Sequence, residues 1–267
     1  MLLALQLQVL FLSETYCIDE WVILNVKNVT NSINLTRAFG ADFFNIKIID
    51  DSANTLLAIR GENLHRIDVS GRQVSSILVN GIVDFDYYDQ EIVFSAKGQD
   101  SYYIGVTRIG DTEYTTLDTM DKPARLVTGR FYDQEFIAVL CENKVSLYNK
   151  EEFELIMSDE LDFVPSIVKV GHGGDFIAMS DGGRIATLDM EAAAVVIWST
   201  GTSGYGWLDG SMIYAINDGT LVVYDYDGLN RRELSKNVSS GFPVTVTTEK
   251  WLYYFSDNKL ARETIIK

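Results

Sequence analysis

Two histidines are the side chains best suited to acid–base chemistry near neutral pH, and neither lies in a recognised catalytic motif. His65 is followed by Arg66 within an apolar stretch, and Asp68 lies three residues further on. This setting is typical of a histidine on the polar face of a β-strand. We therefore interpret His65 as a strand-surface residue without a catalytic role.

The second histidine begins a His172-Gly173-Gly174 segment, whose composition matches the oxyanion-hole loop of esterases. In such a loop, backbone N–H groups donate to a developing oxyanion. That chemistry also requires a nucleophile elbow of the pattern G-x-S-x-G, and the nearest segment, Gly-Thr-Ser-Gly at 201–204, has the wrong spacing. The hairpin context favours a turn over an esterase site.

Oxygen-bearing side chains gather in the segment 225–230, Asp-Tyr-Asp-Gly-Leu-Asn, and could coordinate calcium. A calcium loop of the EF type has its glycine at the sixth position, whereas glycine is fourth in this segment. A turn within a repeat is the better explanation. A calcium ion held by carboxylates in a central channel stays open as an alternative. We predict no catalytic, cofactor-binding or metal-ligating residues and no cofactor.

The other reactive or aromatic residues also have structural interpretations. Cys17 and Cys141 lie more than a hundred residues apart without metal-ligand spacing, so we expect them to pack as small apolar side chains. Sequons for glycosylation, which matter only in a secreted eukaryotic protein, begin at Asn28, Asn34 and Asn237. Tyrosine pairs, expected on strand faces with a partner-binding hot spot as the alternative, are Tyr87-Tyr88, Tyr102-Tyr103 and Tyr253-Tyr254.

The charge balance bears on the kind of partner. The formal net charge is −16, and the basic residues are scattered, with Arg231-Arg232 as the densest group. This excludes nucleic acid as a partner, because phosphate binding depends on clustered Lys and Arg. A soluble, solvated surface explains the acidity, and a salt-adapted host would also explain it. The hydrophobic fraction of 47% is ample for a core.

The first twelve residues, MLLALQLQVLFL, carry no charge. They lack the positively charged start of a secretory signal, because the first lysine is Lys27, and they are too short to span a membrane. The alternation from Leu5 to Val9 predicts a β-strand, with a signal or anchor remnant as the alternative. We expect membrane attachment only through a segment outside this chain.

A repeat runs along the whole chain, and each copy is an apolar strand, a tight turn and a second apolar strand. Seven copies begin near residues 14, 56, 93, 136, 176, 212 and 251, at steps of 36 to 43 residues. Enrichment in Val, Ile, Tyr, Phe and Thr excludes helical repeats of similar length. The turns are expected at Glu62-Asn63, Glu142-Asn143, Gly182-Gly183, Asp218-Gly219 and Asp257-Asn258, which tolerate the positive φ of a hairpin turn.

A polar strand after each hairpin and another strand before the next one complete four strands per repeat. Examples are the segments 73–79, 166–171 and 231–234. The pattern predicts an all-β fold, a β-propeller of six to seven four-stranded blades in a single domain, 1–267. Blade boundaries are expected near the three prolines, Pro123, Pro165 and Pro243.

The sequence allows two alternatives for how the first and last blades of the propeller are completed. The last copy ends at Lys267 without room for its outer strand, and the first copy begins too early for a full blade. We expect the first and last blades to share strands, with Leu3 to Val9 supplying the missing one. Alternatively, these blades are truncated because the chain is a piece of a longer protein.

Two segments resemble the YWTD and TolB-type propeller repeats. YDYDGLNRREL, from Tyr224 to Leu234, is similar to their strand, DG turn and outer strand. The segment from Val168 to Gly183 is similar to their strand pair, with His-Gly-Gly-Asp in place of Ser-Pro-Asp-Gly. Between Trp21 and Ser70, the chain also resembles the propeller that follows a membrane segment and a PEGA module in surface proteins of candidate-phylum bacteria. This resemblance implies a binding or scaffolding role in an extracytoplasmic or cell-surface location.

The leading functional interpretation is a monomeric, non-catalytic module that binds a protein or a glycan. Propeller blades present loops on a rigid scaffold, so such binding requires no reactive group. The alternative is a propeller lactonase or glycosidase that uses channel carboxylates, and in some cases calcium. Two carboxylates within about 5 to 9.5 Å of each other in one pocket would favour glycoside hydrolysis. A propeller that gates a peptidase would need a partner hydrolase domain.

Overall fold

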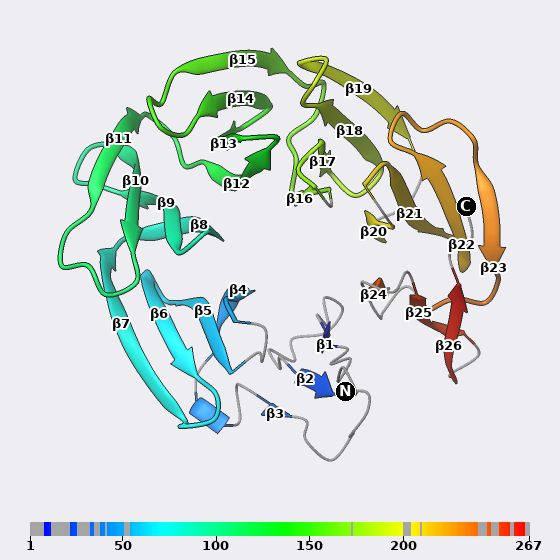
Figure 1. Cartoon of the computed structure of the whole chain (residues 1–267), viewed down its shortest axis with the longest axis horizontal. Coiled ribbons are helices and arrows are strands. Elements are labelled where there is room, and N and C mark those ends of the chain that lie inside the picture. Colours follow the sequence, from blue (N-terminus) through cyan, green and yellow to red (C-terminus); the bar gives the residue numbers. More distant parts are fainter. Residues whose placement is uncertain are drawn as a thin grey trace. The chain divides into compact units, whose positions relative to one another are not determined.

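The computed structural model describes most of the repeat region and short parts of both ends of the chain. The described residues are 8–11, 22–25, 33–34, 38–40, 42–50, 54–171, 173–199, 204–208, 210–239, 245–246, 251–256 and 259–264. Apart from a helical turn at Ala38-Phe39, every regular element among them is a β-strand (Figure 1). The all-β prediction is confirmed for this part of the chain.

The strands form seven antiparallel sheets, and neighbouring strands in each sheet are consecutive along the chain. Five sheets have four strands. They are β4 (Phe44–Ile48), β5 (Thr55–Arg60), β6 (Asn63–Asp68) and β7 (Gln73–Asn80); β8 (Ile82–Tyr88), β9 (Glu91–Lys97), β10 (Tyr102–Arg108) and β11 (Thr115–Met120); β12 (Arg125–Phe131), β13 (Gln134–Cys141), β14 (Lys144–Asn149) and β15 (Leu155–Glu160); β16 (Ile167–Val170), β17 (Phe176–Ser180), β18 (Arg184–Asp189) and β19 (Ala194–Ser199); and β20 (Gly204–Trp207), β21 (Met212–Asn217), β22 (Thr220–Asp225) and β23 (Arg232–Ser235).

Two further sheets have three described strands each. They are β1 (Gln8–Phe11), β2 (Val22–Asn25) and β3 (Ile33–Asn34), and β24 (Thr245–Val246), β25 (Trp251–Ser256) and β26 (Lys259–Thr264). The prediction of six to seven four-stranded blades is therefore wrong in its count, because five sheets have four strands. Strand β1 pairs with β2 and not with the last sheet, so the described strands do not show the predicted strand sharing. Residues 1–7, which include most of the segment predicted to close the ring, lie outside the described residues.

Burial decreases from the second strand of each four-stranded sheet to the fourth. Strand β9 has five consecutive buried residues, whereas β15 has none. A strand covered on both faces has a continuous apolar sequence, and a strand at an open edge has a polar one. This explains why the sequence repeat is most visible in the second and third strands.

One backbone hydrogen bond recurs in four sheets and closes the hairpin formed by the second and third strands. In each case the residue after the third strand donates its N–H to a carbonyl at the start of the second strand. The donors and acceptors are Val69 and Asn54 (2.8 Å), Lys150 and Glu135 (3.0 Å), Met190 and Asp175 (3.0 Å), and Tyr226 and Ser211 (2.9 Å). The sequence repeat is therefore also a repeat of hydrogen bonding.

The third strands of these four sheets end in Asp or Asn, and three of those side chains cap the following turn. Asp68 accepts from Gly71 N (2.8 Å), and Asn149 accepts from Glu151 N (2.8 Å). Asp189 accepts from Glu191 N (3.0 Å). Such side chains replace a backbone acceptor in a tight turn, so the repeat conserves turn chemistry as well as strand pattern.

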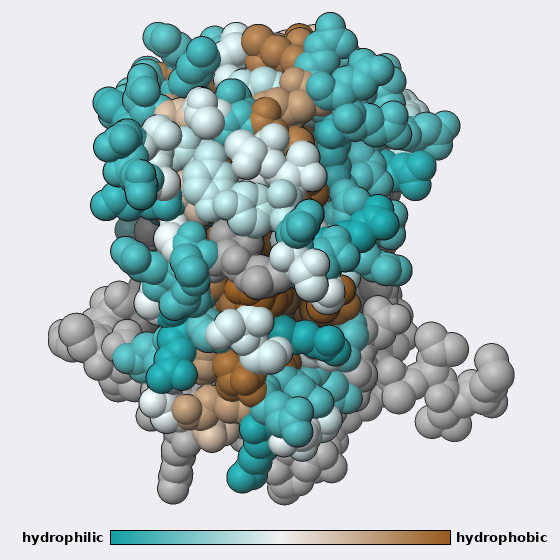
Figure 2. All heavy atoms as spheres, turned by 90° about the vertical axis from the view of Figure 1, so that its left-hand side faces the viewer, coloured by the Kyte–Doolittle hydropathy of each residue, from teal (hydrophilic) through white to brown (hydrophobic). Residues whose placement is uncertain are grey.

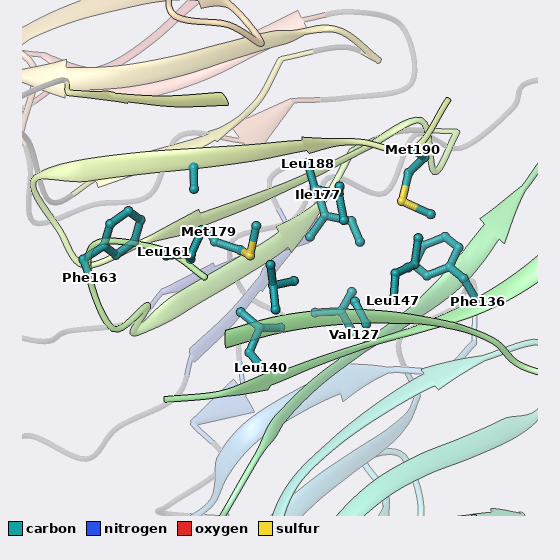
Figure 3. Close-up of a cluster of buried hydrophobic side chains, with 13 residues drawn as sticks. Val127, Phe136, Leu140, Leu147, Leu161, Phe163, Ile177, Met179, Leu188 and Met190 are labelled. Atoms are coloured by element: carbon teal, nitrogen blue, oxygen red, sulfur yellow. The ribbon is translucent and has the colours of Figure 1, made fainter. Parts of the chain in front are cut away.

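The chain divides into two compact units, Met1–Leu126 and Val127–Lys267. In the first unit, a cluster that includes Leu57, Phe85 and Phe94 fills the space between the sheets β4–β7 and β8–β11. In the second unit, one cluster lies between β12–β15 and β16–β19. Figure 3 shows its apolar side chains meeting from the two sheets, among them Val127, Phe136, Leu140 and Leu147 on one side and Ile177, Met179 and Leu188 on the other. Each fully buried side chain of this size contributes about 1.5–3 kcal/mol.

Where the structure describes them, the hairpin turns contain the expected positive-φ residues with one shift, and the predicted turn pair Asp257-Asn258 lies outside the described residues. Asp218 and Gly219 have φ of 46° and 74°, as a type I′ turn requires, and Glu142 has φ of 54°. In the first hairpin the positive φ is at Gly61, one residue before the predicted pair, and Asn63 already belongs to β6. Pro123 and Pro165 lie between sheets as predicted.

Valine at both positions of the β21–β22 turn is expected to lower the free energy of unfolding by about 2 kcal/mol, because β-branched residues resist positive φ. The double variant is Asp218→Val, Gly219→Val, and Thr220→Val in the adjacent strand is the control. Thermal or urea unfolding measures the difference. An unchanged midpoint in the double variant would contradict the turn geometry.

Candidate functional site

Two carboxylates on β8 hold the first strands of two successive sheets together in the first unit. Asn45 on β4 donates from Nδ2 to Asp84 Oδ1 (2.5 Å) and to the Phe85 carbonyl (3.0 Å). Lys47 Nζ lies 2.8 Å from Asp86 Oδ1. Asp84 Oδ2 also accepts from the backbone N–H of Leu126 (2.9 Å). The two carboxylates thus link β4, β8 and the start of β12.

The local backbone of β4 allows this link. A register shift interrupts the β4–β5 pairing between Phe44 and Lys47, and Asn45 within it has φ of 46°. Asparagine tolerates this left-handed conformation better than most residues. The bulge therefore accompanies the two hydrogen bonds that Asn45 makes to β8.

Asp84 has a pKa that differs from that of an ordinary aspartate. Loss of hydration in its mostly buried position raises its pKa to about 6, and the N–H of Leu126 and the charges of Lys47 and Arg125 oppose that rise. A carboxyl group with such a pKa could act as a general acid. Here both oxygens of Asp84 accept hydrogen bonds from the protein, which makes Asp84 a structural link.

A similar link joins the first strands β16 and β20 in the second unit. Lys169 Nζ donates to the Tyr205 carbonyl (2.6 Å), and Trp207 Nε1 donates to the Lys169 carbonyl (2.9 Å). The Tyr205 hydroxyl donates to the Ala178 carbonyl (3.1 Å). Desolvation raises the pKa of Tyr205 far above its usual value, so the hydroxyl remains a donor.

A polar surface depression of about 440 Å³ lies beside β9, β10 and the turn that follows β10. Its carboxylates are Glu91, Asp111 and Glu113. Glu91 Oε1 accepts from Arg108 Nη2 (2.7 Å), and Asp111 accepts from the Arg108 backbone N–H (3.3 Å). Two of the three carboxylates therefore hold the end of the hairpin together.

Of the two histidines, only His65 lies among the described residues. It is half-buried on β6, where its Nδ1 lies 3.4 Å from Ser76 Oγ and its ring meets Phe43 edge to face. Burial, and then the charge of Arg60, lowers the pKa of His65. The strand position is confirmed, although the side chain also packs against its neighbours.

The glycines after His172 form a tight turn, as the hairpin context predicts. Gly174 is buried, has φ of 82°, and donates its N–H to the Gly171 carbonyl (3.1 Å). A Cβ at Gly174 would lie only 1.9 Å from the Arg130 carbonyl oxygen. The glycine is therefore required by close backbone packing, and its N–H is used within the turn.

The 225–230 segment is the turn between β22 and β23. Asn230 Nδ2 donates to Asp225 Oδ2 (2.6 Å), and Leu229 N donates to Asp227 Oδ1 (3.0 Å). These side chains satisfy the turn itself, in agreement with the turn interpretation. The described part of the chain contains no cluster of three or more His, Cys, Asp or Glu side chains suited to a metal ion.

The remaining singled-out residues have packing roles where they are described. Tyr87 packs against the first-unit cluster, and Tyr103 stacks on Tyr114 at 5.8 Å. Tyr254 is buried, and the Cys141 side chain is partly buried. Asn237 is exposed, whereas Cys17, Asn28 and Pro243 lie outside the described residues.

Three exposed apolar side chains lie at one end of the sheet β12–β15. Tyr132, in the β12–β13 turn, is 75% exposed, and Leu155 and Ile156, where β15 begins, are 52% and 50% exposed. Turns of an antiparallel sheet alternate between its two ends, so the β12–β13 and β14–β15 turns lie at the same end. At this end, Lys150 Nζ in the β14–β15 turn donates to Glu135 Oε2 near the start of β13 (2.6 Å). We refer to Tyr132, Leu155 and Ile156 as the β12–β15 apolar surface.

The outer strands of the first unit present a different surface. Figure 2 shows the face that carries β7 and β11, which is mostly hydrophilic with apolar atoms in small separate groups. In the described residues, no helix has the length and apolar character needed to cross a membrane.

Comparison with known proteins supports the fold and gives no family. No family model and no curated protein matches the sequence. A chain in the crystal structure of the mitotic checkpoint complex matches with a TM-score of 0.64 at 10% identity, covering 93% of this chain and 82% of that chain. The structure of KlHsv2 with loop 6CD replaced by a Gly-Ser linker matches with a TM-score of 0.59 at 16% identity, covering 90% and 83%.

At these identities the likeness concerns the fold alone. Together with the five four-stranded sheets, it shows that the chain has a β-propeller-like fold. The resemblance to TolB and YWTD repeats and to PEGA-module proteins stays a prediction.

Asp84, Asp86, Asn45 and Lys47 lie in no motif that the sequence alone makes recognisable. The available signal was the pair of carboxylates at alternate positions in the otherwise apolar strand Ile82–Tyr88. A buried polar group requires a partner, and such a pattern therefore indicates a tertiary contact. The partner strand could not be identified, because Asn45 and Asp84 are 39 residues apart.

Proposed function

We propose that this chain is a propeller module that binds a protein partner and carries out no reaction of its own. The observation that supports the proposal is the β12–β15 apolar surface, on a fold of the WD40 type whose members generally serve as protein-interaction scaffolds. Protein interfaces have an apolar, aromatic-rich centre, and exposed tyrosine is a frequent anchor. That the whole chain, 1–267, forms a single propeller domain belongs to the same proposal.

The enzyme alternative requires carboxylates free to act on a substrate. Asp84 and Asp86 bind neighbouring strands, and Glu91 binds Arg108. These contacts favour a structural role for the carboxylates, and no specific observation favours catalysis. A cell-surface location and a glycan ligand stay predictions from sequence.

The test compares partner capture by three forms of the chain, immobilised and exposed to extract of the native host. The double variant Tyr132→Ser, Leu155→Ser is expected to lose the proteins that the wild-type chain retains. Val164→Ser is the control, because Val164 is 61% exposed but lies in the loop after β15, at the other end of the sheet.

Two outcomes would contradict the proposal. The first is an identical set of captured proteins in all three forms. The second is stabilisation of the wild-type chain by calcium or a lactone, seen as a melting temperature that rises with ligand concentration, because that result would support the enzyme alternative.

A further inference from the structure

The fourth strand of each four-stranded sheet has an outer edge, and four of the five are irregular. Strands β7, β11, β15 and β23 each contain a register shift against their neighbour. Strand β19 pairs with β18 without interruption over all six residues. Bulges on edge strands hinder pairing with further strands, so β19 lacks a protection that the others have.

The sequence of β19 adds to this difference. Ala194–Ser199 reads AVVIWS and contains no charge, whereas β15 carries Asp159 and Glu160 and β23 carries Arg232 and Glu233. Charged side chains are the second common protection of an edge strand. Among the strands that the structure describes, only β18 pairs with β19, and Ile197 is 43% exposed.

Strand β19 is also held in place on both of its faces. Val195 packs against the cluster between β12–β15 and β16–β19. Trp198 packs against the next cluster, and its Nε1 donates to the Tyr226 carbonyl (3.1 Å). An edge fixed in this way is pre-organised, so an added strand would order few groups of the receiving chain.

Charges near β19 indicate the kind of strand that fits. Asp189 pairs with Ala194 at one end of β19, and Glu191 lies in the preceding turn. The chain as a whole carries −16, which disfavours pairing with a second copy and favours a basic segment.

We propose that the open edge of β19 receives an extended, basic segment of a partner protein, with apolar residues at alternate positions. The added strand pairs with the backbone of β19, and one of its apolar side chains lies beside Ile197. This edge is a second binding surface, distinct from the β12–β15 apolar surface.

The experiment uses the full chain and a fluorescent peptide of alternating valine and threonine with lysines at both ends. A second peptide of equal charge has prolines in place of the central valines and cannot form a strand. Fluorescence anisotropy is expected to show binding of the first peptide alone. Amide hydrogen exchange is expected to slow at residues 194–199 when it binds.

Two variants that change the net charge equally locate the site. Ile197→Lys is expected to weaken binding of the strand-forming peptide about tenfold or more, which corresponds to about 1.4 kcal/mol. Ile156→Lys, on the irregular and charged β15, is expected to leave peptide binding unchanged. In the capture experiment, Ile156→Lys is expected to lose the proteins bound by the β12–β15 apolar surface, whereas Ile197→Lys retains them. Failure of one proposal is therefore distinguishable from failure of the other.

The inference is overturned if both peptides bind equally, if protection appears outside β19, or if Ile197→Lys binds like the wild-type chain. It is also overturned if no peptide binds and sedimentation shows a dimer that Ile197→Lys abolishes, because the occupant is then a second copy of this chain.

Discussion

Replacement of Gly174 by alanine is expected to lower the free energy of unfolding by about 4 kcal/mol or more. The new Cβ would meet the Arg130 carbonyl oxygen at 1.9 Å, and a backbone atom cannot move aside as a flexible side chain can. The φ of 82° adds strain for any residue with a Cβ. Urea unfolding followed by circular dichroism measures the change.

Gly173→Ala is the matched control for this effect. Gly173 precedes Gly174 in the same turn and has φ of 99°, but the nearest atom to its added Cβ is 3.6 Å away, on Asp175. The expected loss is about 1 kcal/mol, from backbone strain alone. Similar losses at both positions would show that the approach of Arg130 to Gly174 is not tight.

Replacement of Asp84 by alanine is expected to cost about 3 kcal/mol of unfolding free energy at pH 5, below the folded pKa of Asp84. The change removes the acceptor for the Leu126 N–H and for one bond of Asn45, and a buried donor without a partner costs about 1–3 kcal/mol. Asp84→Asn keeps an acceptor for Leu126 and removes the charge. It is therefore expected to cost less than alanine.

Comparing the pH dependence of stability in the wild-type chain and in Asp84→Asn also tests the raised pKa of Asp84. Since the pKa of Asp84 is about 6 in the folded chain and near 3.8 when unfolded, the folded state binds the proton more tightly. The contribution of Asp84 to stability is therefore fully present below the unfolded pKa and is lost as pH rises through about 6. Relative to Asp84→Asn, the wild-type chain should gain about 1.4 kcal/mol per pH unit as pH falls from about 6 towards the unfolded pKa near 3.8.

Urea titrations at pH 7.5 and pH 5 give this difference directly. The other carboxylates of this acidic chain contribute to both proteins, so their effects cancel in the comparison. Parallel stability profiles for the two proteins would mean that Asp84 titrates at its ordinary pKa.

The β17–β18 turn contains an aspartate, Asp181, whose pKa shifts in the opposite direction from that of Asp84. Burial alone would raise the pKa of Asp181, but N–H groups of Arg184 and Gly183 and the Arg184 guanidinium lower it to about 2. Arg184 Nη2 lies 2.7 Å from Asp181 Oδ2. The two aspartates differ because Asp181 is bonded to a cation in its own turn, whereas Asp84 relies on neutral donors from distant strands.

The sequence by itself determined the strands, the hairpin turns and the repeat. Alternation, β-branched residues and a turn such as Asp218-Gly219 act over a few residues, so they are visible in the linear sequence. The count of four-stranded sheets was not determined in the same way. The first and last sheets have three described strands each, and whether a fourth strand joins such a sheet depends on contacts between distant segments.

Only the tertiary structure decided which residues meet. Asn45 reaches Asp84 across 39 residues, and the need for Gly174 comes from Arg130 in another sheet of the second unit. The open edge of β19 likewise depends on strand register, which the bulges of the other outer strands interrupt. Strand register and the stacking of sheets are set by contacts between segments that are distant in the sequence. A local sequence pattern does not identify the distant segment that it will contact.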